Sequence, residues 1–186
     1  MLTNIELRVV SLANGGSPNG NHSLILGEKW GDRQLPLVIG PFEAQAIARS
    51  LKGIKSPYPL THDLFSKTLT ASGVALEEVI ITELLDGFYQ CVMIVRQPMG
   101  NTEQIDARPS DAIALALRCE CPIYATEEVL EQTQKTPQRR RVLEAAKHPL
   151  KSCSMDDLQS LLEEVLANED YQKAAQIRDE MLRREG

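Results

Sequence analysis

Apolar residues alternate with polar ones over much of the first 40 residues, a spacing typical of strands that bury one face. A strand is predicted over 2–12, and two further strands over 23–40 with a turn around Gly31–Asp32. Between them, residues 13–21 are rich in Gly, Asn, Ser and Pro, which favour turns. The N-terminal part of the chain is therefore predicted to form three strands.

The spacing of apolar residues changes after Pro41. One helix face is formed by residues at intervals of three and four, namely Ala44, Ile47, Ala48 and Leu51. Helices are predicted over 41–53, 60–73, 108–119 and 126–133, with Thr61 and Thr126 as expected N-caps. Strands are predicted over 74–85, 88–97, 101–107 and 121–125, and Asp86–Gly87 is a strong signal for a hairpin turn.

Two segments far apart in the chain align without a gap, VIGPFEAQAIA (38–48) and DARPSDAIALA (106–116). In both, a proline is followed two residues later by an acid, Glu43 or Asp111. Each segment follows a hairpin-like pair of strands, which favours an internal duplication. The alternative is chance similarity between two helix starts, where proline and acids are common. We predict an α+β fold in which duplicated strand–strand–helix units pack their helices on a mixed sheet.

Composition limits the classes of protein to which the chain can belong. It has 186 residues, of which 42% are hydrophobic and 25% charged, as in ordinary globular proteins. No membrane span or secretory signal is expected, because no apolar run is long enough and the N-terminus lacks a basic region. Cys119 and Cys121 have no second pair of metal ligands nearby, so free thiols in the cytoplasm are expected instead of zinc.

Charge is distributed unevenly. Residues 1–134 hold 10 Lys/Arg and 16 Asp/Glu, and residues 152–186 hold four and nine. Between them, residues 135–151 hold six basic residues and one acid. An acidic body argues against a broad phosphate-binding face. The basic segment is interpreted as a solvated linker, with a nucleic-acid contact as the alternative.

The last 34 residues differ in pattern from the rest. Residues 153–186 contain no Gly or Pro before the final residue and carry two apolar stripes, around Leu158–Leu166 and Ala174–Leu182. This pattern predicts a helical hairpin, which is too small to be stable alone. We therefore expect it to pair with another copy, giving a homo-oligomer, or with another protein. The predicted domains are 1–133, a basic linker over 134–152, and the hairpin over 153–186.

Two resemblances are carried by long motifs. LPLVIGPFEAQAIARSLKG, PLTHDLF, IDARPSDAIALALR and CPIYATEEVL resemble the bifunctional nuclease (BFN) domain family of bacteria and plants, over nearly all of residues 1–133. LQSLLEEVLANEDYQKAAQIRDEM resembles the UVR motif of bacterial excision-repair proteins, a helical hairpin for protein–protein contact. The first resemblance implies a nuclease that acts on DNA and RNA. At Tyr58 the sequence departs from the family, which usually has arginine before the proline that is Pro59 here.

Glu43 and Asp111 are the first candidate site residues. A carboxylate in the first turn of a helix accepts backbone N–H bonds and complements the helix dipole, so both have a structural interpretation. The functional alternative is a pair of ligands for a divalent cation, Mg²⁺ or Mn²⁺, which would assist phosphodiester hydrolysis. Both interpretations can hold together.

The other candidates lie in two short motifs. His62 and Asp63 start a helix, and His62 is a candidate general acid or base because its ordinary pKa lies near neutrality. Asp63 and Asp106 are further candidate catalytic residues, as are Glu43 and Asp111. Arg108 and Ser110 are candidates for binding a phosphate. Arg108 can equally pair with Asp106 or Asp111 and stabilise the fold.

Two functions follow from these residues. The first is a nuclease of low sequence specificity. The second is a non-catalytic adaptor in DNA repair or stress response, which recruits partners through the UVR-like hairpin. Convergence of the candidate residues on one concave surface, with a bound cation, would favour the enzyme, and dispersal into separate helix caps would favour the adaptor.

Overall fold

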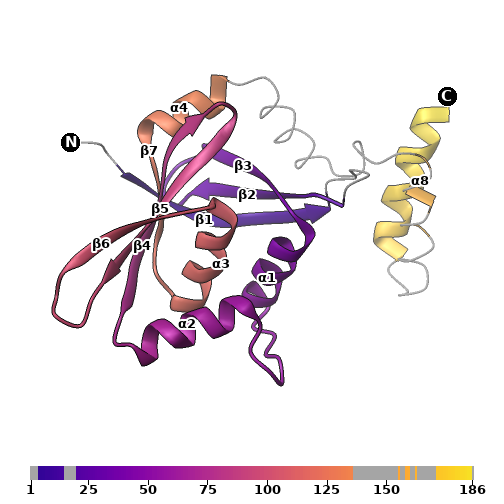
Figure 1. Ribbon diagram of the computed structural model, residues 1–186. Helices are drawn as coiled ribbons and strands as arrows, with labels where there is room; N and C mark the ends of the chain where they lie inside the picture. The colour runs from indigo at the N-terminus through magenta and orange to yellow at the C-terminus, as the bar shows by residue number, and fades with distance from the viewer. Residues whose placement is uncertain are drawn as a thin grey trace.

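The computed structural model describes residues 4–14, 20–135, 155, 158, 159, 162 and 171–185 (Figure 1). Its strands are β1 (Asn4–Asn14), β2 (His22–Glu28), β3 (Gln34–Ile39), β4 (Ala75–Leu85), β5 (Phe88–Arg96), β6 (Thr102–Ala107) and β7 (Ile123–Thr126). Its helices are α1 (Pro41–Leu51), α2 (Thr61–Ala71), α3 (Pro109–Cys119), α4 (Glu127–Lys135) and α8 (Tyr171–Glu185). The described elements up to residue 135 agree closely with those predicted from the hydrophobic pattern.

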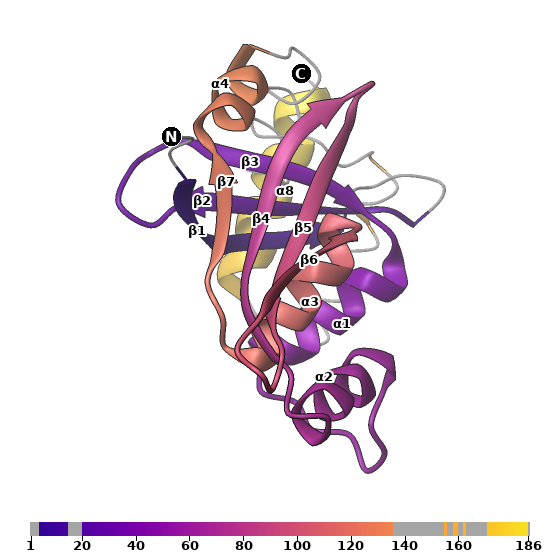
Figure 2. The same ribbon diagram turned by 60° about the vertical axis from the view of Figure 1, so that its left-hand side comes forward.

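The described strands form a mixed sheet in the order β3-β2-β1-β7-β4-β5-β6. Neighbours are antiparallel except β4 and β7, which pair in parallel between Val79–Ile81 and Ile123–Ala125. The sheet is strongly twisted, so that β1–β3 run across the direction of β4 and β5 (Figures 1 and 2). This twist brings β3 and β5, which are far apart in strand order, to opposite walls of one cavity.

The two halves of the sheet repeat one arrangement. A three-stranded antiparallel meander is followed by a helix, first as β1–β2–β3–α1 and then as β4–β5–β6–α3. The predicted repeat unit contained two strands and a helix; in the structure a third strand, which the alternation also predicted, belongs to each unit. Helices α1 and α3 pack against each other, so the ends of the two units meet (Figure 2). Their buried faces consist of small and branched residues, including Ala44, Ile47, Ala112 and Ile113.

Particular residues determine where each helix begins. Prolines occupy the first position of α1 and α3, where no helical N–H is required. Thr126 caps α4, since its Oγ1 accepts a hydrogen bond from the N–H of Val129 at 3.4 Å. The expected N-cap at Thr61 is wrong: α2 is preceded by Leu60, whose N–H donates to Asp63 Oδ2 at 3.0 Å.

Helix α8 belongs to the predicted C-terminal hairpin. Ala174 and Ile177 of α8 are buried together with Leu158, and Leu162 and Met181 pack against this cluster. The remainder of the predicted hairpin, including its turn, and nearly all of the predicted linker over 134–152 lie outside the described residues. Among the described helices, none is long and apolar enough to cross a membrane.

Candidate active site

Three helices begin with the same arrangement of charge. The third residue of α1, α2 and α3 is an acid: Glu43, Asp63 and Asp111, respectively. A carboxylate at this position faces unpaired backbone N–H groups and the positive end of the helix dipole. Because α3 packs against both α1 and α2, these three helix starts form the frame of one site.

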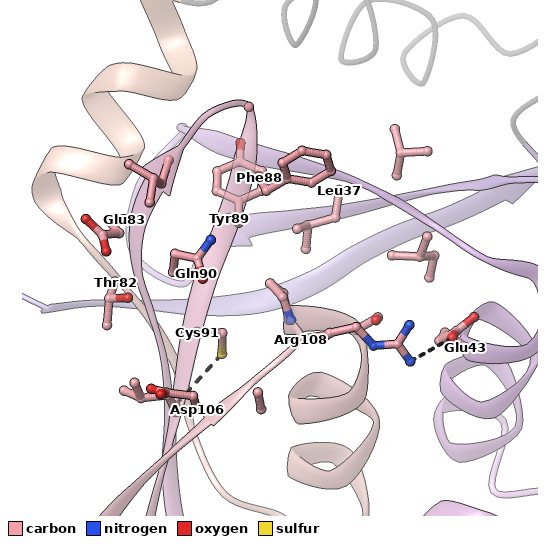
Figure 3. A pocket seen from close by; sticks show the side chains of 18 of the residues that line it. Leu37, Glu43, Thr82, Glu83, Phe88, Tyr89, Gln90, Cys91, Asp106 and Arg108 are labelled. Atoms are coloured by element: carbon pink, nitrogen blue, oxygen red, sulfur yellow. Dashed lines mark hydrogen bonds and ion pairs between the residues drawn. The ribbon is translucent and has the colours of Figure 1, made fainter.

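Arg108 joins the starts of α1 and α3. Its Nη2 donates to Glu43 Oε1 at 3.0 Å (Figure 3). Its Nε donates to Asp111 Oδ2 at 2.7 Å. The two carboxylates raise the pKa of Arg108, with Asp111 making the larger contribution. The Arg108 side chain is nevertheless 69% exposed, so a positive charge held by two acids remains open to solvent.

His62 extends this network to α2. Its Nε2 lies 3.2 Å from Asp111 Oδ1, so both oxygens of Asp111 have a partner. The His62 side chain is 17% exposed, and Nδ1 has no hydrogen-bond partner among the described residues. The arrangement is an acid–histidine pair, in which the carboxylate orients the ring and the second nitrogen can carry a proton.

Arg118 forms an ion pair with Asp63, next to His62 in the chain, and was not predicted as a site residue. Its side chain is 9% exposed and donates through Nε to Asp63 Oδ1 at 2.5 Å. Nη1 donates to the carbonyl of Ala114 at 2.7 Å, and Nη2 to the carbonyl of Ala46 at 3.2 Å. Arg118 lowers the pKa of Asp63, which also accepts a backbone hydrogen bond. One guanidinium thus links α1, α2 and α3.

A cavity of about 1110 Å³ opens beside Arg108, between β3 and the strands β4–β6. Its polar lining includes four residues predicted for the site, namely Glu43, Asp106, Arg108 and Ser110. Its apolar lining includes Val38, Leu85 and Phe88, each of which is more than half exposed. Figure 3 shows Phe88 and Arg108 on different elements around this space.

The predicted residues therefore divide into three groups. Glu43, His62, Arg108 and Asp111 form one connected network. Asp106 and Ser110 line the cavity beside that network, while Asp63 lies in the adjoining ion pair with Arg118. Of the two partners expected for Arg108, the structure has Asp111 and not Asp106, and adds Glu43. Hydrogen bonds connect the candidates, but only Glu43, Asp106, Arg108 and Ser110 line the cavity, and His62, Asp63 and Asp111 are not among its lining residues.

Gly40 lies close to the Glu43 carboxylate at the start of α1. A Cβ atom added at Gly40 would lie 2.5 Å from Oε2 of Glu43, which is far inside van der Waals contact. The backbone at residue 40 therefore lies against the Glu43 carboxylate and limits where it can move. This contact leaves Oε1 directed at Arg108.

The expected divalent cation fits these residues only in part. Glu43 and Asp111 offer the carboxylate oxygens that Mg²⁺ and Mn²⁺ prefer. Both, however, already bind the guanidinium of Arg108. Within the described ranges, no group of three or more His, Cys, Asp or Glu residues is arranged to hold a metal ion. The metal therefore stays a prediction.

Comparison with known proteins identifies the family. Residues 24–138 match the family described as "Bifunctional nuclease domain". An uncharacterized protein of Mycobacterium tuberculosis is 42% identical over 127 residues, which cover 68% of this chain and 74% of that protein. Proteins named bifunctional nuclease from Oryza minuta and bifunctional nuclease 1 from Oryza sativa are each 26% identical, over 87% of this chain and 54% of theirs. The chain therefore spans about half the length of the rice proteins it matches. Because this match covers more than half of the chain, the chain belongs to the bifunctional nuclease domain family.

Proposed function

We propose that the protein is a nuclease that hydrolyses phosphodiester bonds of DNA and RNA with low sequence specificity. The proposal rests on the network of Glu43, Arg108, Asp111 and His62. These residues come from the starts of three helices, and Glu43 and Arg108 line the cavity. The names of the rice relatives support the same activity.

In the proposed mechanism, Arg108 binds the phosphate. Its guanidinium is exposed, and Nη1 has no protein partner in the described part of the chain. Hydrogen bonds from a guanidinium to phosphate oxygens are strong and grow stronger as negative charge accumulates at phosphorus. Glu43 and Asp111 hold the guanidinium in place, and the hydroxyl of Ser110 can donate a further hydrogen bond to the phosphate.

His62 serves the proton transfers. Asp111 holds Nε2, which leaves Nδ1 to accept a proton from the attacking water. The water oxygen forms a bond to phosphorus as the bond to the leaving oxygen breaks. The leaving oxygen takes up a proton from solvent, and His62 returns the proton it accepted to solvent. Contacts of this kind go to the phosphate and not to base edges, so they favour low sequence specificity and do not distinguish DNA from RNA.

The divalent cation remains a separate part of the proposal. Glu43 and Asp111 are the residues that would hold Mg²⁺ or Mn²⁺, and the ion would supply positive charge near the phosphate. Arg108 already provides one such charge between the two carboxylates. No step above depends on the metal.

The activity is tested with purified full-length protein on labelled single-stranded DNA and RNA. The parent should cleave both, and Asp111→Asn should reduce kcat by about 100-fold or more, because the partners of His62 and Arg108 are both changed. Asp32→Asn is the matched control, since Asp32 is exposed and forms no salt bridge with a described residue. Equal cleavage by the Asp111→Asn protein and the parent would mean that the activity lies elsewhere in the protein or comes from a contaminant, and would contradict this site.

A second proposal concerns the C-terminal hairpin, whose resemblance to the UVR motif suggests binding to a protein partner or to another copy. In α8, Leu182 is 67% exposed, while Ala174 and Ile177 are buried against Leu158. A pair of short helices with so small a buried cluster is not stable alone, which favours a further contact. This contact would give a homo-oligomer or recruit a partner in DNA repair or stress response, and it is compatible with the nuclease.

A further inference from the structure

Positive charge that is not used in salt bridges gathers on one part of the domain. Between Glu43 and Glu77 the chain holds four basic residues and a single acid, Asp63. The remainder of residues 1–134 holds six basic residues and fifteen acids. The four basic residues are Arg49, Lys52, Lys55 and Lys67, and none forms a salt bridge with another described residue.

The same part of the domain exposes aromatic and aliphatic side chains. Helix α2 has no buried residue along its length. Phe65 of α2 is half exposed, and Tyr58, in the connection before α2, is 81% exposed. In Figure 2 this connection and α2 project from the body below α1 and α3. The four basic residues with Tyr58 and Phe65 are called here the α1–α2 surface.

We propose that the α1–α2 surface binds single-stranded nucleic acid and leads the strand to the active site. The lysines and Arg49 contact phosphates, and Tyr58 and Phe65 stack on unpaired bases. A basic surface with aromatic side chains is the usual means of binding an unpaired strand without reading its sequence. This inference rests on the proposed nuclease function and names the form of its substrate.

Continuity with the active site supports this assignment. His62 and Asp63 lie in the first turn of α2, between Tyr58 and Phe65 in the chain. The pKa of Asp63 is lowered mainly by Arg118 and also by the charge of Arg49, so the end of α1 lies near the start of α2. A strand bound on this surface is therefore adjacent to the His62–Asp111 pair.

Charge decides between nucleic acid and a second copy of the chain. In a symmetric pair the same surface meets itself, so the four basic residues would face like charges. The single acid between Glu43 and Glu77 in the chain, Asp63, is already paired with Arg118 and cannot neutralise these basic residues. An anionic partner is therefore favoured. The small number of cations favours an unpaired strand over a duplex, which is bound mainly through many phosphate contacts.

Binding is measured by fluorescence anisotropy, with the full chain and a labelled phosphorothioate strand of about 16 nucleotides, which resists cleavage. Replacing Lys52, Lys55 and Lys67 together by Gln should weaken binding. It should also reduce the slope of log K against log salt by about 0.7 for each lost phosphate contact. Tyr58→Ala should weaken binding by about 10-fold with an unchanged salt slope, because stacking involves no ion release. Arg8→Gln is the control, since Arg8 is exposed on β1 and lacks a salt-bridge partner among the described residues.

Unchanged affinity and salt slope in the triple-Gln protein would overturn the proposal. So would loss of self-association in sedimentation, or loss of binding to phosphatidylserine vesicles, with strand binding intact, because the surface would then serve a second copy or a membrane. Binding and cleavage are scored separately. If the parent binds the strand but cleaves nothing, the nuclease proposal is contradicted and the binding surface stands. If the parent cleaves but the variants bind as the parent does, the binding surface is contradicted and the nuclease proposal stands.

Discussion

Replacing Arg118 by Met removes the guanidinium that links α1, α2 and α3 while retaining a side chain of similar length. The substitution eliminates the ion pair with Asp63 and the hydrogen bonds to the carbonyls of Ala46 and Ala114. Methionine fills the space of the arginine stem, so the change tests the charged group and not the packing. Arg118→Lys retains a charge for Asp63 but cannot reach both carbonyls with a planar group.

The magnitude follows from burial. Hydrogen bonds to a charged group contribute about 1.5–3 kcal/mol each, and removing one partner of a fully buried pair costs about 3–5 kcal/mol. Arg118 is 9% exposed but Asp63 is 30% exposed, so water recovers part of the loss. We expect Arg118→Met to reduce the free energy of unfolding by about 2–3 kcal/mol, and Tm by about 10 °C for a domain of this size.

The assay is urea and thermal unfolding of the full chain, followed by circular dichroism at several pH values. The pKa of Asp63 is lowered in the folded protein, so its contribution is present above the unfolded-state pKa of about 3.9. That contribution is lost as the pH falls through the lower folded-state pKa. The stability difference between the parent and Arg118→Met should therefore be largest near neutral pH and shrink below about pH 4.

The reasoning is refuted if Arg118→Met unfolds at the same temperature as the parent at neutral pH. It is also refuted if the difference between the two proteins grows on acidification, since the ion pair would then not stabilise the fold. Arg8→Met serves as the control and should leave Tm unchanged, because Arg8 is exposed.

Three further predictions concern neighbouring features. Gly40→Ala should lower kcat with little loss of stability, measured by parallel cleavage and unfolding assays, because the new Cβ displaces the Glu43 carboxylate; unchanged kcat would contradict this. Arg108→Gln should bind Mn²⁺ more tightly than the parent in calorimetry, because Glu43 and Asp111 lose their counter-charge; no binding by either protein would remove the metal from the proposal. Leu182→Asp should shift the mass measured by light scattering to that of a monomer if α8 mediates self-pairing, and an unchanged mass would contradict this.

Much of the fold could be predicted because local patterns determine it. Alternation of apolar residues gave the strands, and helical spacing with prolines at the helix starts gave α1 and α3. The alignment of residues 38–48 with 106–116 placed Glu43 and Asp111 at equivalent positions, and the structure brings both to one arginine. Equivalent positions met because the two units pack through their helices.

Arg118 and the apolar wall of the cavity could not be predicted in this way. The partners of Arg118 lie 55 and 72 residues away in the chain, and an arginine near a helix end ordinarily complements the helix dipole. A weak signal exists, since Arg118 follows Asp111 and Ala114 along one face of α3. In the sequence, Phe88 looks like an ordinary strand residue. The alternation of apolar and polar residues does not reveal the sheet twist that turns Phe88 toward the cavity.

The most direct test of the active-site assignment is kcat/KM on single-stranded RNA and DNA for the parent, Arg108→Gln and Arg8→Gln. Both substitutions remove one exposed positive charge, but only Arg108 lies between Glu43 and Asp111 at the cavity. We predict that Arg108→Gln loses about 100- to 1000-fold, the range for removing one group that stabilises the transition state. Arg8→Gln should cleave as the parent does. Equal kcat/KM for Arg108→Gln and the parent would contradict the assignment of this network as the active site.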